Sequence, residues 1–237
     1  NANIDGDTAM GTMLKYGSEG SKFFIDNYIL PKDASAAHIS GDIHIHDKDF
    51  YMLTETCCQI DLIPLFENGF STGHGYLREP NGIQSYSALG CIAIQANQNE
   101  MHGGQSVPNF DWAMARGVAK TYGKEYRRAF TAWLRIRRGL GLEEAGRLTE
   151  TALGACGLEP RLGLEAEMEA DMKGANLPIG PEDALAAHAY AAGEAARATE
   201  NRVYQSMEAL VHNLNTMNSR AGAQVPFSSI NYGTDTS

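Results

Sequence analysis

The sequence predicts an α/β fold, in which buried strands alternate with helical excursions. Strand-like runs lie within residues 41–62 and at residues 225–232, and a long, mostly helical stretch separates them. The 43% hydrophobic content allows a chain of 237 residues to bury a sizeable core. Neither Asn1 nor Ser237 resembles a natural terminus, so we expect residues 1–237 to form a single partial domain of a longer protein.

Composition narrows the classes of partner. The formal net charge of −10 argues against nucleic-acid or anionic-membrane partners, which require clustered Lys and Arg. No apolar run approaches the ~20 residues of a membrane span, and no signal peptide opens the chain. Four cysteines are too few for a disulfide scaffold of this length, so a reducing cytoplasm is the expected location.

Helical periodicity and its interruptions predict most of the remaining elements. Helices are expected at residues 12–30 (ended by Pro31), 34–40, 64–68, 83–100, 112–138 with a basic outer face, and 184–215. Residues 139–200 should form two or three surface helices. A glycine-rich loop is expected at residues 69–82, either a phosphate cradle or a mobile surface loop. Gly103, Gly104 and Pro108 predict that residues 101–111 are an irregular loop.

Residues 41–62 read as two strands, at 42–46 and 56–62, that form the wall of an active site. Successive strand side chains point to opposite faces, so His44 and His46 share one face and Cys57 and Gln59 share one. In a strand Cys58 then points away from Cys57, which disfavours a disulfide between them. Two imidazoles and a thiol could meet in one space, as a redox site or a metal site. For each of these residues taken alone a structural role is the simpler interpretation, and only the group favours a functional one.

The loop at residues 101–111 is a second candidate for ligand contacts, because it is polar and follows a buried helix. It offers hydrogen-bonding groups on His102, Gln105, Ser106 and Asn109.

Three stretches together resemble one enzyme family. They are GDIHIHDKDFYMLTETCCQIDL, GFSTGHGYLREPNGIQSYSALGCIAIQANQNEMHGGQSVPNFD and MEALVHNLNTMNSRAGAQVPFSSINYGTDTS. The family is that of the anaerobic (class III) ribonucleoside-triphosphate reductases, which are glycyl-radical enzymes. The resemblance covers roughly residues 1–128 and 200–237, whereas residues 129–199 resemble the family only in being helical.

The resemblance implies the first half of a ten-stranded α/β barrel, with a large helical share. In this family a radical stored on a C-terminal glycine passes to a finger-loop cysteine. The resulting thiyl abstracts the ribose 3′-hydrogen, the 2′-hydroxyl leaves as water, and a deoxyribonucleoside triphosphate results.

The family motif places its second cysteine, which takes part in the reduction, on Cys57. His44 and His46 match the family's His-x-His-Asp run, which implies substrate positioning or proton handling rather than metal ligation. We also expect Gln105 and Ser106 to bind substrate. Asn218 replaces a common histidine of the family, and we assign it no role.

The resemblance also implies partners. These are ribonucleoside triphosphates as substrates, dNTP or ATP effectors, a homodimer, a radical S-adenosylmethionine iron–sulfur activase, and formate or a thioredoxin-type reductant. The region that resembles the family's effector site includes residues 73–85. In this region Arg78 suits a phosphate, and Glu79 could pair with Arg78. The radical glycine, finger-loop cysteine, C-terminal zinc site and ATP-cone do not occur in these residues, so this chain alone is expected to be inactive.

Three alternatives remain open from the residues. A metal-dependent hydrolase could use His44, His46 and an Asp but needs further His or carboxylate ligands, which residues 225–232 do not offer. A glycyl-radical enzyme of the pyruvate formate-lyase kind usually carries its cysteines mid-chain. A non-catalytic binding or regulatory fragment is the third.

Overall fold

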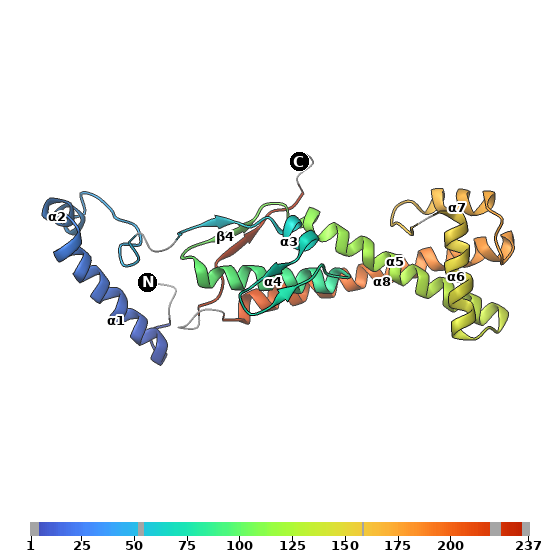
Figure 1. Cartoon of the computed structure of the whole chain (residues 1–237), viewed down its shortest axis with the longest axis horizontal. Coiled ribbons are helices and arrows are strands. Elements are labelled where there is room, and N and C mark those ends of the chain that lie inside the picture. Colours follow the sequence, from blue (N-terminus) through green and yellow to red (C-terminus); the bar gives the residue numbers. More distant parts are fainter. Residues whose placement is uncertain (1–4, 52–54, 158, 219–223, 234–237) are drawn as a thin grey trace.

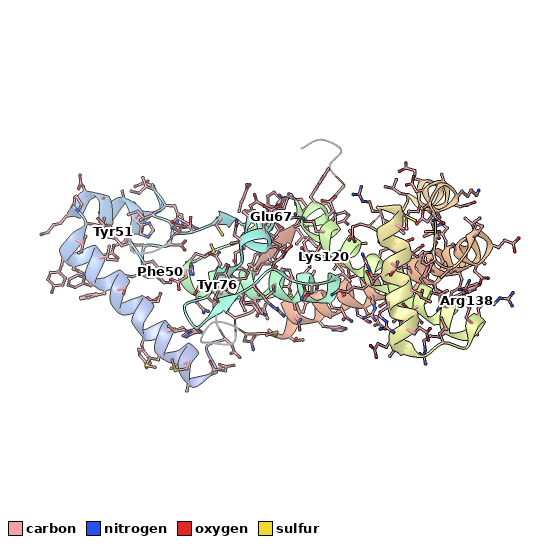
Figure 2. All side chains as sticks on the ribbon, turned by 45° about the vertical axis from the view of Figure 1, so that its right-hand side comes forward. Phe50, Tyr51, Glu67, Tyr76, Lys120 and Arg138 are labelled. Atoms are coloured by element: carbon pink, nitrogen blue, oxygen red, sulfur yellow. The ribbon has the colours of Figure 1, made fainter. Side chains whose placement is uncertain are left out.

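The computed structural model describes residues 5–51, 55–157, 159–218 and 224–233, which form an elongated molecule (Figure 1). At one end lie α1 (Ala9–Phe24), η1 (Ile25–Ile29) and α2 (Lys32–Ser40). The middle contains α3 (Leu62–Asn68), α4 (Ile83–Glu100) and a small sheet, and the long helices α5 (Phe110–Arg138) and α8 (Pro181–Thr216) extend from there. At the other end lie α6 (Leu142–Cys156) and α7 (Glu165–Gly174). Figure 2 shows Phe50 and Tyr51 near the N-terminal helices and Arg138 at the opposite end.

The sheet is parallel and joins three segments that are far apart in the sequence. Its strands are β1 (Cys58–Gln59), β4 (Gln105–Val107) and β5 (Ser228–Ile230), in the order β1–β4–β5. Helices connect the parallel strands, which confirms the predicted α/β class. A separate antiparallel pair, β2 (Phe70–Ser71) and β3 (Tyr76–Leu77), forms within the glycine-rich stretch.

Most predicted helices are confirmed. The helix expected at residues 12–30 falls in α1–η1, which ends one residue earlier at Ile29, and residues 34–40 fall in α2. Residues 64–68 fall in α3, and residues 112–138 and 184–215 in α5 and α8. The predicted helix at residues 83–100 has the bounds of α4. None of the described helices is both long enough and apolar enough to cross a membrane.

The predicted strand at residues 42–46 is wrong. The amides of Asp42 and Ile43 donate to the Ala37 carbonyl oxygen, at 2.9 and 3.3 Å, and the Ile45 amide donates to His38 Nδ1. The preceding helix α2 therefore takes the amides that a strand would need for its ladder.

Two further strand predictions need correction. The strand expected at 56–62 shrinks to β1, because the Asp61 side chain accepts the Ile63 amide at 3.0 Å and starts α3 at Leu62. Residues 101–111, predicted as an irregular loop, contain β4, the central strand of the sheet. The glycines and Pro108 flank β4 rather than interrupt it, and its backbone pairs with both neighbours.

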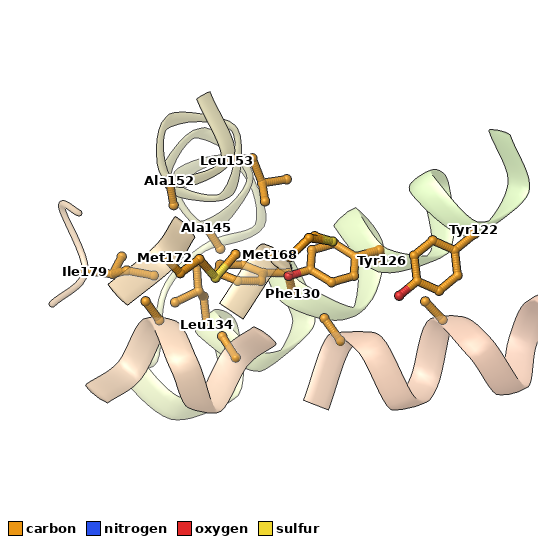
Figure 3. Close-up of a cluster of buried hydrophobic side chains, with 14 residues drawn as sticks. Tyr122, Tyr126, Phe130, Leu134, Ala145, Ala152, Leu153, Met168, Met172 and Ile179 are labelled. Carbon is orange, nitrogen blue, oxygen red and sulfur yellow. The ribbon is translucent and has the colours of Figure 1, made fainter. Parts of the chain in front are cut away.

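Two hydrophobic cores stabilise the molecule. The first, here called the sheet core, packs α3, α4, α5, α8 and β4 together around buried residues such as Leu62, Tyr86 and Val107. The second, the distal core, lies between α5, α6, α7 and α8 around Tyr126, Phe130 and Met168 (Figure 3). The helices within residues 139–200 were expected to lie on the surface, but they enclose a core of their own.

Candidate functional site

One face of the sheet packs on helix α4. Cys58 Sγ lies 3.0 Å from Asn97 Nδ2 and 3.7 Å from Met101 Sδ. Gln105, which β4 places opposite Cys58, is only 3% exposed and accepts a hydrogen bond from the same Asn97 amide at 2.8 Å. The row that contains Cys58 and Gln105 therefore faces the helix.

The opposite face of the sheet is open. Because strand side chains alternate, Cys57 and Gln59 point away from α4, and so does Ser106. The register aligns Gln59, Ser106 and Ser229 in one row across the three strands. Cys57 and this row line a cavity of about 540 Å³. The open face thus presents a free thiol beside an amide and two hydroxyl groups.

The four cysteines occupy different environments. Cys57 is exposed and Cys58 is half-buried, and both are free thiols. Cys91 is buried, and this burial raises the pKa of its thiol. Burial also raises the pKa of Cys156. Since a thiolate is the reactive form, Cys91 and Cys156 suit structural positions, and Cys57 is the exposed thiol on the open face.

His44 and His46 line a different cavity, of about 590 Å³, together with His38 and His102. The ring centroids of His44 and His46 lie 5.7 Å apart. The expectation that these two imidazoles and the Cys57 thiol share one space is wrong, because Cys57 lines the cavity over the sheet instead. The error follows from the missing strand at residues 42–46.

Ser106 and Gln105, predicted together as substrate-binding residues, are separated by the alternation of β4. Ser106 faces the cavity over the sheet, whereas the Gln105 side chain lies beneath it against α4. Gln105 also borders this cavity, but its side chain is only 3% exposed and accepts a hydrogen bond from Asn97.

The sequence reasoning did not identify a contact between Asp47 and His102. Asp47 Oδ1 lies 3.3 Å from His102 Nε2, and Asp47 Oδ2 lies 3.3 Å from His46 Nε2. Asp47 is part of the His-x-His-Asp run, and His102 is a histidine in a polar loop, so both residues carried a signal. What the sequence could not give was their proximity.

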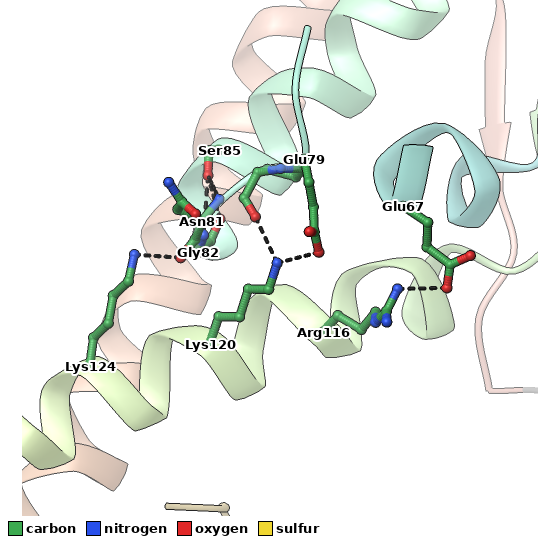
Figure 4. A network of polar contacts seen from close by, with 9 residues as sticks. Glu67, Glu79, Asn81, Gly82, Ser85, Arg116, Lys120 and Lys124 are labelled. Atoms are coloured by element: carbon green, nitrogen blue, oxygen red, sulfur yellow. Dashed lines mark hydrogen bonds and ion pairs between the residues drawn. The ribbon is translucent and has the colours of Figure 1, made fainter. Parts of the chain in front are cut away.

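The predicted effector residues lie in a loop that is held against α5. Arg78 is exposed, and Glu79 pairs with Lys120 of α5 (Figure 4). The hydrogen bond from Lys120 holds the pKa of Glu79 below its usual value. Lys124 donates to the Asn81 carbonyl oxygen at 2.6 Å, so two lysines of α5 fasten this loop. The suggested pairing of Glu79 with Arg78 is replaced by a pairing with Lys120.

Comparisons with known proteins agree with this architecture. A family model described as "Anaerobic ribonucleoside-triphosphate reductase" matches residues 1–237. The chain belongs to this family. Relatives named anaerobic ribonucleoside-triphosphate reductase from Salmonella typhimurium and Escherichia coli are each 29% identical over 115 residues, 48% of this chain. A relative of the same name from Enterobacteria phage T4 is 31% identical over 106 residues, 44% of this chain.

The matched segments span only 16–17% of the length of these curated relatives. Family membership gives no support to the hydrolase alternative. Within the described residue ranges, no three His, Cys, Asp or Glu side chains are grouped as the ligands of a metal ion.

Proposed function

We propose that this chain is part of the catalytic α/β barrel of an anaerobic ribonucleoside-triphosphate reductase. The observation that carries the proposal is the position of Cys57 on the open face of a parallel sheet, in a chain that the family model matches from residue 1 to residue 237. In this proposal β1, β4 and β5 belong to the first half of the barrel, and their open face is one wall of the substrate site.

Cys57 takes part in the reduction of the ribose as a hydrogen donor. Ser106, with Gln59 and Ser229 in the same row, supplies hydrogen-bonding groups for the sugar. Gln105 acts from beneath the sheet by fixing Asn97, so its contribution to substrate binding is indirect. These roles follow from side-chain direction and chemistry.

His44 and His46 bind or protonate another part of the substrate from the neighbouring cavity. Imidazole titrates near neutral pH, which suits the departure of the 2′-hydroxyl as water. Arg78 and Glu79 lie in the region that we propose for dNTP or ATP effectors, where an exposed guanidinium suits a phosphate.

The whole protein, in this proposal, is a cytoplasmic homodimer that reduces ribonucleoside triphosphates anaerobically. Its glycyl radical, installed by an S-adenosylmethionine iron–sulfur activase, and its zinc site belong to other parts of the longer protein. Formate or a thioredoxin-type system supplies the reducing equivalents.

The experiment that tests the proposal compares three cysteine variants in the full-length, activated enzyme. Cys57→Ser should abolish deoxynucleotide formation, whereas Cys58→Ser and Cys91→Ser should retain most of it. Cys58 is the matched control, because it is the adjacent thiol on the opposite face of the sheet. Loss of activity in Cys58→Ser with full activity in Cys57→Ser would reverse the assignment of faces and refute the proposal.

A further inference from the structure

A carboxylate joins the turn after His46 to the loop that passes close to Cys57. Asp47 lies between His46 and His102. Its Oδ2 is 3.3 Å from His46 Nε2, and its Oδ1 is 3.3 Å from His102 Nε2. Its φ of +45° is uncommon for a residue other than glycine, although Asp adopts it more readily than most. This backbone angle belongs to the turn that aims the carboxylate at both imidazoles. We call Asp47 and His102 the latch.

Both sides of the latch are anchored. On the turn side, Ser18 of α1 donates to Asp49 at 2.6 Å, and the buried Lys48 ammonium lies 2.7 Å from Asp26. On the loop side, the His102 amide donates to the Glu55 carbonyl oxygen at 2.7 Å. The contact between Asp47 and His102 therefore connects two segments that are each held in place.

The orientation of the His102 ring depends on few groups. The Phe50 ring packs against it, with 4.3 Å between centroids. The Nδ1 atom of His102 is buried and has no hydrogen-bond partner among the described residues. Asp47 is thus the polar contact that orients this ring.

The residue after His102 lies close to Thr56 and Cys57. Gly103 has a φ of +136°, and a Cβ added there would lie 1.5 Å from the Thr56 carbonyl oxygen and 3.1 Å from Cys57 Sγ. The loop backbone therefore packs directly against the backbone and thiol at the edge of β1. A shift of His102 would be passed to Cys57 through one residue.

We propose that Asp47 and His102 are positioning residues that fix the Cys57 thiol over the open face. The proposal rests on the proposed function, in which Cys57 is the reacting thiol. Asp47 holds the His102 ring, His102 sets the path of the loop, and Gly103 lets that loop contact the thiol. The cavity of the histidines and the cavity over the sheet are coupled by this connection, although they are separate spaces.

The test measures the rate at which iodoacetamide alkylates Cys57 in the full-length protein, by mass spectrometry of its peptide. Asp47→Gly, which adopts a positive φ freely but has no carboxylate, and His102→Leu should each raise this rate at least threefold, because the loop no longer restrains the thiol. His102→Gln keeps an N–H group that can face Asp47, and it should stay within twofold of the wild type. Asp42→Gly, at an exposed aspartate outside the latch, is the matched control and should leave the rate unchanged.

Cys91 reports on folding in the same samples, since it is buried and should stay unreactive in every variant. Asp47→Gly keeps the positive φ of this position accessible, so it tests the latch even if His102→Leu unfolds the protein and exposes Cys91. A Cys57 rate within twofold of the wild type in Asp47→Gly would overturn the proposal.

Alkylation requires no turnover, so the two proposals fail separately. An unchanged Cys57 rate with an inactive Cys57→Ser enzyme would remove the latch and leave the proposed function. A faster Cys57 rate with an active Cys57→Ser enzyme would keep the latch and remove the catalytic role.

Discussion

Removing one buried hydroxyl in the distal core should measurably destabilise the protein. Tyr126 Oη lies 2.7 Å from His188 Nδ1, and His188 Nε2 lies 3.0 Å from the backbone carbonyl oxygen of Glu165. A carbonyl oxygen only accepts, so Nε2 carries a proton, and in the neutral tautomer of the ring Nδ1 accepts from the Tyr126 hydroxyl. Burial raises the pKa of Tyr126, which keeps that hydroxyl protonated.

Tyr126→Phe would leave the Nδ1 of His188 without its donor in a residue that is only 4% exposed. Leaving a buried acceptor unsatisfied costs about 1–3 kcal/mol of unfolding free energy. For a chain of this size each kcal/mol lowers the melting temperature by about 2–4 °C. Urea unfolding followed by circular dichroism gives the free energy, and a thermal melt gives the temperature.

Tyr190→Phe is the matched control, because Tyr190 lies on the same helix as His188 and is 44% exposed. It should change the unfolding free energy by no more than about 0.5 kcal/mol. A double-mutant cycle with His188→Leu should return a coupling of about 0.5–3 kcal/mol. Equal effects of Tyr126→Phe and Tyr190→Phe, with no coupling, would refute the reasoning.

Two further predictions concern other parts of the chain. The hydrogen bond from Lys48 holds the pKa of Asp26 below its usual value. A carboxyl pKa lowered by folding stabilises the protein fully above the unfolded value of about 4, and this stabilisation is lost as the pH falls through the folded value. Melts across this range should therefore show the wild type losing its advantage over Asp26→Asn in acid, and a constant difference would contradict the assignment. In Gly117→Ala the new Cβ would lie 2.8 Å from the Tyr86 ring, which should destabilise by about 1–3 kcal/mol. Gly193→Ala, with nothing within 4 Å, should instead stabilise by roughly 0.4–1 kcal/mol, and urea unfolding of both separates the two cases.

Much of the helical framework could be predicted from the sequence, because helix signals are local. The apolar spacing and small residues of α4 gave its bounds, and Pro31 marked the end of the first helical segment. The distal core was missed since its helices are rich in alanine. Their buried positions, such as Ala187 and Ala191, carry little hydrophobic contrast.

The strands were harder to predict because each has only two or three residues and depends on distant partners. Residues 105–107 form a strand because their backbone pairs with β1 and β5, which lie far away in the sequence. Residues 42–46 fail to form one because α2 takes their amides. Local sequence contains neither fact.

The features of the candidate site also separate into those that follow from local sequence and those that depend on tertiary structure. The opposite directions of Cys57 and Cys58 follow from strand alternation, and the structure agrees with them. The separation of His44 and His46 from Cys57 and the contact of Asp47 with His102 depend on tertiary structure. Sequence patterns name the residue types of a site more readily than they give its geometry.

The central claim is that Cys57 faces the substrate while Cys58 does not. Alkylation of the full-length protein with and without a saturating ribonucleoside triphosphate tests this claim most directly, with Cys156 as the internal reference. The account predicts that the nucleotide slows alkylation of Cys57 at least threefold and leaves Cys156 within twofold. Protection of Cys58 with no protection of Cys57 would contradict it.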